Sequence, residues 1–177
     1  MVRRDLDGAF HDLVMSEGPS LYRLARLLSE DSAAAEDLVQ VALLRAWKSW
    51  PRVCAAEDRA AYVRRILVNA ARTGWRRDWR VESPSGMISA PSAHDAYQQF
   101  DDRERLMEAL RVLAPRQRAA VVLRYFCDLD DATIADLLGC SPATVRSQVS
   151  RALARLRIAE LNSVPRSPRA DSQQERS

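Results

Sequence analysis

Apolar side chains recur every three or four residues along most of this chain, which is the spacing of an amphipathic α-helix. Over residues 5–28 the pattern predicts one helix or two abutting helices, with Gly18-Pro19 bending or interrupting the stretch. Further helices are predicted over residues 31–50 and 58–78. The first half of the chain is therefore expected to form a helical bundle.

The segment 31–50 has clear start and stop signals. Ser32 is the expected N-cap, Glu36 and Asp37 lie near the positive helix start, and Pro51 is expected to end the helix. One face is apolar and consists of Ala35, Leu38, Val39, Ala42, Ala46, Trp47 and Trp50.

The segment 58–78 combines an apolar stripe with a basic face. The stripe is expected to consist of Ala61, Tyr62, Ile66 and Ala70, with Val63, Leu67 and Gly74 as further members. The opposite face consists of Arg64, Arg65, Asn69, Arg72 and Arg76. This helix is thus expected to bury one side and to present positive charge on the other.

Helical periodicity stops after residue 80, where Pro, Ser and Gly become frequent. A connection of about 20 residues is too long for an ordinary tight loop, so we expect a domain boundary there. Helices resume near residue 102, with Leu106, Ala109, Leu110 and Leu113 on one face and a new helix from Pro115 that includes Ala119, Val122, Leu123 and Tyr125-Phe126. The chain is predicted to be all-α, with two small helical domains over 5–80 and 103–160, a flexible linker over 81–102 and a disordered tail over 161–177.

Residues 129–157 have the signature of a helix-turn-helix. Asp130 or Asp131 is expected to cap a first helix that ends before Gly139, which suits a left-handed C-terminal position. Ser141 as N-cap and Pro142 as first residue then begin a second helix that runs to about residue 157. Its expected buried stripe is Val145, Val149, Ala152, Leu153 and Leu156, and its outer stripe is Ala143, Arg146, Ser147, Ser150 and Arg151. Small and basic residues on the outer face are typical of a helix that reads the major groove of DNA.

Charge is concentrated in two segments, although the net charge is only +3. Residues 59–80 carry seven Arg against one Asp, and residues 141–159 carry four Arg and no acidic residue. Two basic segments on a balanced chain indicate two contacts with a polyanion. Arg is a suitable residue for this task because its planar fork binds phosphate and guanine in bidentate fashion.

Several classes of protein are not supported by the residues present. Cys54, Cys127 and Cys140 show no metal-binding spacing, and their odd number favours a reducing cytoplasm over a disulfide framework. His11 and His94 are isolated, and no nucleophile–base pair or phosphate loop is evident, so we expect neither an enzyme nor a cofactor. No apolar run is long enough to cross a membrane, so no membrane insertion is expected.

Three collinear segments resemble the hallmarks of extracytoplasmic-function (ECF, group 4) sigma factors of the sigma-70 family. They are AEDLVQVALLRAW (35–47), AYVRRILVNAARTGWRR (61–77) and the helix-turn-helix (129–157). The resemblance extends over roughly residues 8–80 and 103–158 and looks greatest to actinobacterial members. It implies an alternative sigma factor that binds RNA polymerase core and directs promoter-specific initiation of transcription.

The resemblance also implies a role for each segment. The helix that contains 35–47 would bind the clamp helices of the largest polymerase subunit, with Asp37, Gln40, Leu44 and Arg45 as candidate residues. The helix over 61–80 would read and melt the −10 element with Arg65, Asn69, Arg72, Trp75, Arg76, Arg77, Trp79 and Arg80, although Trp75 is equally consistent with a core position. The second domain would contact the polymerase flap and read the −35 element with Ser141, Ala143, Thr144, Arg146, Ser147, Ser150, Arg151 and Arg155. An anti-sigma factor is a further partner that the family implies.

A free-standing helix-turn-helix transcriptional regulator with a helical sensor domain is the main alternative. The basic helix over 59–80 argues against it, because a sensor domain rarely needs a second basic helix. Five positions also differ from residues that are frequent in the family, namely Val41, Leu43, Tyr62, Thr73 and Thr133. These differences bear on the detail of polymerase and promoter contacts and leave the predicted fold unchanged.

Overall fold

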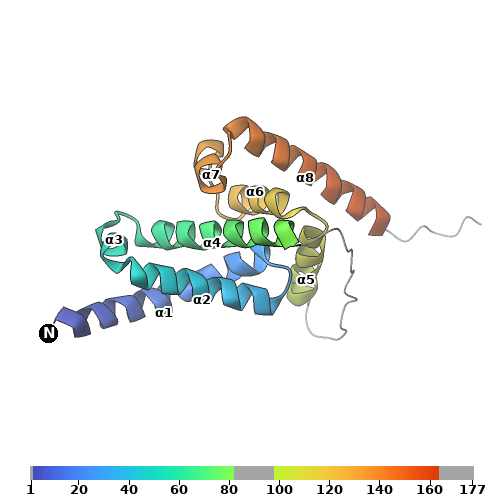
Figure 1. Cartoon of the computed structure of the whole chain (residues 1–177). Coiled ribbons are helices and arrows are strands. Elements are labelled where there is room, and N and C mark those ends of the chain that lie inside the picture. Colours follow the sequence, from blue (N-terminus) through green and yellow to red (C-terminus); the bar gives the residue numbers. More distant parts are fainter. Residues whose placement is uncertain (1, 82–97, 164–177) are drawn as a thin grey trace, which may run out of the picture.

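The computed structural model describes the backbone of residues 2–81 and 98–163, and the side chains of residues 8–75 and 104–159. Within those ranges the chain forms eight α-helices and no strand (Figure 1). The predicted all-α fold is therefore confirmed. Four helices precede the gap in the described residues and four follow it.

The first four helices form one packed unit. They are α1 (Val2–Leu28), α2 (Ser32–Lys48), α3 (Trp50–Ala55) and α4 (Arg59–Val81). α1, α2 and α4 all contact one another, and the short α3 connects one end of α2 to the start of α4. α1 is a single helix that continues through Pro19, so the interruption considered at Gly18-Pro19 is not present.

Helix starts in this unit differ from the expectation in two places. Asp31 caps α2, because its backbone is extended and its carboxylate accepts a hydrogen bond from the Ala34 N–H at 2.8 Å, whereas Ser32 is already helical. Pro51 lies at the start of α3 and does not end the preceding helix, which stops at Lys48. The first turn of a helix leaves its N–H groups unpaired, so a proline is well tolerated there.

The core of the first unit is centred on Val63 and Leu67 of α4, which were expected as further members of its apolar stripe, and on Val68, which was not expected. Val63, Leu67 and Val68 are completely buried, and Tyr62 and Ile66 are only partly buried. α4 contacts α1, α2 and α7, so its apolar contact surface is broader than a single stripe. Elsewhere in this unit, the ring of Phe10 packs edge-on against the rings of Trp47 and Trp50, with centroid distances of 4.9 and 5.2 Å.

The remaining helices form the second unit: α5 (Gln98–Arg111), α6 (Pro115–Tyr125), α7 (Asp131–Leu138) and α8 (Pro142–Ser163). α5 begins inside the segment predicted as linker, and α8 continues into the segment predicted as tail. The rest of those two segments, 82–97 and 164–177, lies outside the described residues.

Some apolar side chains of the second unit are more exposed than the pattern predicted. On α5, Met107 is buried, and Leu106 is 50% exposed. Leu153 of α8 is 39% exposed, although its neighbour Ala152 is completely buried. Tyr125, the last residue of α6, and Phe126, the C-cap that follows it, are 62% and 48% exposed.

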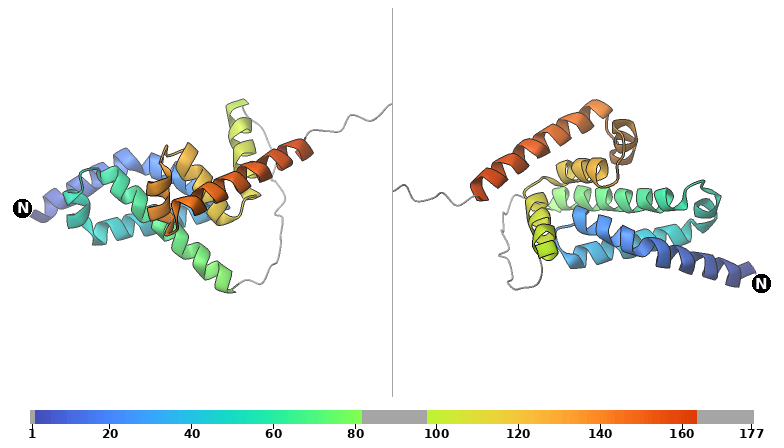
Figure 2. Two further views of the ribbon diagram at one scale, coloured as in Figure 1. Left: turned by 90° about the horizontal axis from the view of Figure 1, so that it is seen from above. Right: turned by 180° about the vertical axis from the view of Figure 1, so that it is seen from behind.

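The two units pack directly on each other. α6 contacts α1 and α7 contacts α4, and both views of Figure 2 show α6 and α7 lying against the first unit. Arg118 of α6 is only 4% exposed at this seam and donates hydrogen bonds to the carbonyl oxygens of Leu110 at 3.0 Å and Ser29 at 3.2 Å. Nothing in the sequence pattern distinguishes Arg118 from the exposed arginines.

Candidate nucleic-acid and polymerase surfaces

The turn of the helix-turn-helix is held by three local capping interactions. Asp130 caps α7 by accepting the Thr133 N–H at 2.8 Å, and this hydrogen bond holds the pKa of the Asp130 carboxyl below its ordinary value. Gly139 ends α7 in the left-handed region with φ 63° and ψ 49°. Ser141 then caps α8 by accepting the Thr144 N–H at 3.2 Å. The caps predicted from the sequence are confirmed, with Asp130 as the capping residue of α7.

α8 is anchored by one face and free on the other. Val145, Val149 and Ala152 are buried against α6 and α7. The candidate DNA-reading side chains on α8 and at its start are exposed, with Ser147 half-buried: Ser141, Ala143, Thr144, Arg146, Ser147, Ser150, Arg151 and Arg155. The small outer residues leave the backbone accessible, and the three arginines can approach phosphates or base edges.

Arg146 belongs to a charged cluster that sequence reasoning missed. Its Nη1 lies 3.5 Å from Oδ2 of Asp131 at the start of α7, and Asp131 also forms an ion pair with Arg124 of α6. The Arg146 side chain remains 62% exposed, so most of its guanidinium is available to a ligand. Asp131 thus links a candidate base reader to the helix behind it. Only the acidic residue at the start of α7 gave a hint of this contact.

α4 presents its candidate −10 residues to different degrees. Arg65 is exposed, and Asn69 and Arg72 are half-buried. Trp75 is partly buried and packs against the core, so its ring belongs in part to the fold. Arg76, Arg77, Trp79 and Arg80 lie within α4, but their side chains are outside the described residues.

Arg72 also contacts the helix-turn-helix. A Cβ atom added at Gly139 would collide with Nη1 of the Arg72 guanidinium, which places this side chain against the turn between α7 and α8. The contact therefore joins a candidate −10 residue to the domain that carries the candidate −35 residues. Sequence reasoning missed it because the two residues are 67 positions apart (139 − 72).

α2 carries the candidate polymerase-binding residues on its solvent side. Asp37, Gln40, Leu44 and Arg45 are all exposed, and Ala35, Ala42 and Ala46 on the opposite side are buried. Leu44 is 54% exposed and its neighbour Val41 is 40% exposed, so the outer face of α2 is partly apolar. An exposed apolar strip with charged ends suits contact with another protein.

The described residues show no metal-binding or membrane-spanning feature. They contain no group of three or more His, Cys, Asp or Glu side chains that could hold a metal ion. The three cysteines are free and half-buried. Among the described helices, none is long and apolar enough to span a membrane.

Comparison with known proteins identifies both units. The family described as Sigma-70 region 2 matches residues 13–81, and the family described as Sigma-70, region 4 matches residues 103–156. The RNA polymerase sigma-E factor of Streptomyces avermitilis is 38% identical over 167 residues, which cover 94% of this chain and 93% of the relative. The ECF RNA polymerase sigma factor SigL of Mycobacterium tuberculosis is 31% identical over 144 residues, which cover 78% of this chain and 81% of the relative.

Solved structures agree with these matches. The sigma factor RpoE of Bartonella quintana, in a complex with the anti-sigma factor NepR, superposes with a TM-score of 0.63 at 27% identity, over 89% of this chain and 99% of that one. CnrH, in a complex with the cytosolic domain of CnrY, has the same fold with a TM-score of 0.61 at 22% identity. A free-standing regulator is not supported, because both sigma-70 regions match in order along one chain. The chain belongs to the extracytoplasmic-function sigma factors of the sigma-70 family and is an alternative sigma factor that acts with RNA polymerase at promoter DNA.

Proposed function

We propose that residues 5–80 bind core RNA polymerase and capture the −10 element, and that residues 103–160 read the −35 element. The observation that carries this division is the outer face of α8. That face is exposed, contains three arginines among small polar residues, and has no acidic residue between positions 141 and 159. It can therefore lie in a major groove without repelling phosphates.

In this proposal the outer face of α2 binds the clamp helices of the largest polymerase subunit. Leu44 and Val41 would supply apolar contact area, and Asp37, Gln40 and Arg45 would supply polar contacts around it. Truncation of an apolar residue at the centre of such a surface costs more than truncation at its rim. Leu44 is therefore the residue of α2 whose loss should matter most.

α4 would capture the opened non-template strand of the −10 element. Arg65 and Arg72 are suited to its phosphates, and Asn69 lies between them on the same side of the helix. The exposed part of Trp75 can stack on an unpaired base, and such stacking is worth about 1–3 kcal/mol per base. Arg76, Arg77, Trp79 and Arg80 would extend this surface along the same helix.

The proposed mechanism involves no bond chemistry by this chain. Preferential binding of the opened strand over the duplex would lower the free energy of the melted promoter, so that binding energy drives strand separation. We accordingly propose a non-enzymatic protein without a cofactor that works in the cytoplasm, where the polymerase and the promoters are.

An anti-sigma factor is a further proposed partner. The sigma factor RpoE of Bartonella quintana was solved in a complex with NepR, which is named as an anti-sigma factor. For this chain, an anti-sigma factor would have to cover the outer face of α2 or of α8 to prevent function. Competition between such a partner and core polymerase for the intact chain would identify which face is used.

Co-elution with purified bacterial core polymerase, followed by run-off transcription from genomic fragments, tests the proposed function. We expect stable co-elution and transcripts that depend on the promoter. Leu44→Glu should abolish co-elution, because it places a charge in the middle of the α2 surface. Met15→Glu is the matched control, since Met15 of α1 is 65% exposed and lies outside the proposed surface.

Two results would contradict the proposal. Absence of association between the wild-type chain and core polymerase from its own organism would remove the sigma-factor role. Equal loss of co-elution in Leu44→Glu and Met15→Glu, with both variants folded by circular dichroism, would remove the assignment of α2 while leaving the role in place.

A further inference from the structure

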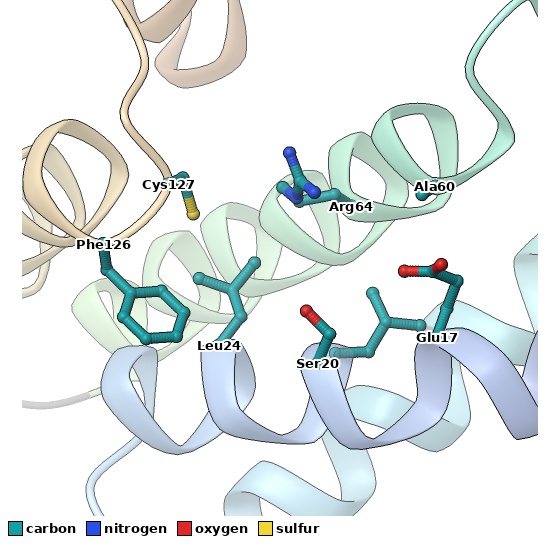
Figure 3. A pocket seen from close by; sticks show the side chains of 8 residues that line it. Glu17, Ser20, Leu24, Ala60, Arg64, Phe126 and Cys127 are labelled. Carbon is teal, nitrogen blue, oxygen red and sulfur yellow. The ribbon is translucent and has the colours of Figure 1, made fainter.

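A pocket of about 130 Å³ lies where the end of α6 meets α1 and α4. Three polar side chains line it: Glu17 and Ser20 come from α1, and Arg64 comes from α4 (Figure 3). All three are half-buried. The pocket therefore brings together a carboxylate, a hydroxyl group and a guanidinium that are partly withdrawn from water.

The two charged groups of this pocket are not neutralised by the protein. Neither Glu17 nor Arg64 forms an ion pair or a side-chain hydrogen bond with the other, or with any other residue in the described part of the chain. A charge that loses part of its hydration is stabilised when an opposite charge replaces the lost water. Here the carboxylate and the guanidinium stay apart across the pocket, so each is free to bind the opposite charge of a ligand.

The rest of the wall is apolar. Leu21 and Leu24 of α1 are 4% and 2% exposed, and Figure 3 shows the ring of Phe126 beside Leu24. An apolar wall of this kind favours a ligand that carries a small hydrocarbon group next to its charges.

The volume of the pocket limits the size of a ligand. An apolar cavity of about 150 Å³ admits benzene, so this pocket has room for about six heavy atoms. Alanine, with its ammonium, carboxylate and methyl groups, has that size. Larger side chains would have to extend past Phe126, which is 48% exposed at the rim.

We propose that this pocket is a binding site for a small free α-amino acid of the size of alanine. The ligand carboxylate binds the guanidinium of Arg64, whose fork suits a carboxylate in bidentate geometry. The ligand ammonium donates to the carboxylate of Glu17 and to the hydroxyl oxygen of Ser20. The small side chain packs against Leu21 and Leu24.

A zwitterion fits this lining better than other small solutes. A simple anion would pair with Arg64 but would be repelled by Glu17, and a simple cation would have the reverse fault. A neutral apolar solute would strip water from both charges and replace none of their hydrogen bonds. The site is independent of the promoter roles proposed for α4 and α8, because none of its three polar residues belongs to those candidate surfaces.

Cys127 provides a reporter inside the pocket. Burial raises the pKa of its thiol and the positive charge of Arg64 counteracts that effect, which agrees with the thiol and the guanidinium facing one space (Figure 3). In a full-length chain with Cys54→Ser and Cys140→Ser, Cys127 is the one thiol that iodoacetamide can alkylate. A ligand in the pocket shields this thiol, so the alkylation rate at constant pH reports occupancy.

A series of ligands tests the recognition of both charges without altering the protein. L-Alanine carries both groups, propionate lacks the ammonium, and ethylamine lacks the carboxylate. With a Kd on the order of 1 mM, as expected for a ligand of about six heavy atoms, L-alanine at about 10 mM should slow alkylation about tenfold. Propionate and ethylamine at the same concentration should slow it less than about twofold. Glycine betaine, a zwitterion without N–H donors, controls for the general stabilising effect of osmolytes and should also give little protection.

Two substitutions in the same chain test the assigned residues. Glu17→Gln and Arg64→Gln each remove one charge from the pocket and should abolish the protection by L-alanine. Glu36→Gln and Arg23→Gln remove the same charges from exposed positions outside the pocket and should leave the protection unchanged. Circular dichroism would verify that all four variants are folded.

The outcomes decide the proposal. Protection by L-alanine alone, lost in both pocket variants and kept in both controls, would establish the site. Absence of protection, or equal protection by L-alanine, propionate and ethylamine, would overturn it. Protection that persists in Glu17→Gln and Arg64→Gln would also overturn it, because the amino acid would then act elsewhere. None of these results bears on core binding, which co-elution of the wild type with polymerase measures separately.

Discussion

α4 and α8 are both basic amphipathic helices, but they differ in how much of the basic face is exposed to solvent. Both bury an aliphatic face, and both turn arginines outward. The outer face of α8 is exposed except at the half-buried Ser147, whereas Asn69, Arg72 and Trp75 of α4 are all half-buried. α4 contacts α7 of the other unit, and α8 contacts only helices of its own unit among the pairs with substantial contact.

The comparison shows that a basic amphipathic helix can contribute a binding surface and a packing surface at once. α8 is supported from one side, so its outward residues can change without consequence for the fold. α4 is supported from two sides, so a substitution at Arg72 alters both a candidate nucleic-acid contact and the seam. Experiments on α4 therefore need controls for stability that experiments on α8 do not.

The largest expected effect concerns the anchoring of α4. Leu67 is completely buried in the core of the first unit, and Leu67→Ala should lower the free energy of unfolding by about 2–5 kcal/mol through lost apolar contact and a cavity. Chemical denaturation followed by circular dichroism would measure this loss. Leu123→Ala, which removes the same atoms from a buried position in α6, is the matched substitution in the second unit.

The pair also tests whether the two units unfold together. Buried residues of both units form one hydrophobic cluster, so we expect a single transition that shifts for either variant. Two separate transitions, with each variant shifting only one of them, would show that the seam contributes little to stability.

A smaller effect is expected on the outer face of α8. Arg146→Ala should weaken binding to a −35 element by about 1–3 kcal/mol if its guanidinium contacts a base edge, and should leave binding to core polymerase unchanged. Arg157→Ala removes the same charge from the same side of α8 about 16 Å further along the helix, and it serves as the control. Fluorescence anisotropy with matched and mismatched duplexes would measure both.

Equal losses for Arg146→Ala and Arg157→Ala would contradict base recognition by Arg146. Such a result would indicate that both arginines act only by neutralising phosphates, and the salt dependence of binding would then fall by about one unit in either variant.

The features that could be predicted from the sequence are local ones. Asp130, Gly139 and the Ser141-Pro142 pair determine the helix-turn-helix through interactions within four residues of one another, and the structure confirms them. Helical periodicity predicted that the candidate residues on α2 and α8 are exposed, because the polar face of an amphipathic helix points away from the core.

The features that could not be predicted depend on tertiary packing. In the sequence, nothing distinguishes Arg118 from an exposed arginine. Its guanidinium can be buried because the fold brings the carbonyl oxygens of Leu110 and Ser29 within hydrogen-bonding distance. Met107 is buried in the core, and the expected Leu106 is half-exposed. Because these two apolar residues are adjacent in one helix, the sequence pattern does not determine which of them faces the core. The ion pair between Arg124 and Asp131 likewise requires α6 and α7 to be placed relative to each other.

A further prediction concerns the acidic residue behind Arg146. Asp131→Asn should reduce the ratio of specific to non-specific DNA affinity about twofold to fivefold, because Arg146 loses a partner that orients it while the surface loses a repulsive charge. Asp136→Asn removes an exposed carboxylate from the same helix and controls for the charge alone. Titration with specific and random duplexes at matched salt would provide both affinities. An equal change in the two variants would mean that Asp131 acts only through long-range charge.

The smallest expected effect is a difference in acid stability that comes from the start of α7. The N–H of Thr133 holds the pKa of Asp130 below its ordinary value, so the charged carboxylate stabilises the folded state above the unfolded pKa of about 4, and this contribution disappears as pH falls through the lower folded value. Asn is a comparable cap without a titrating group. The wild type should therefore lose stability relative to Asp130→Asn between about pH 5 and pH 2.5, as measured by urea denaturation at each pH. Other carboxylates titrate in both chains and cancel in the difference, so a constant difference across this range would show that the cap does not depend on the charge of Asp130.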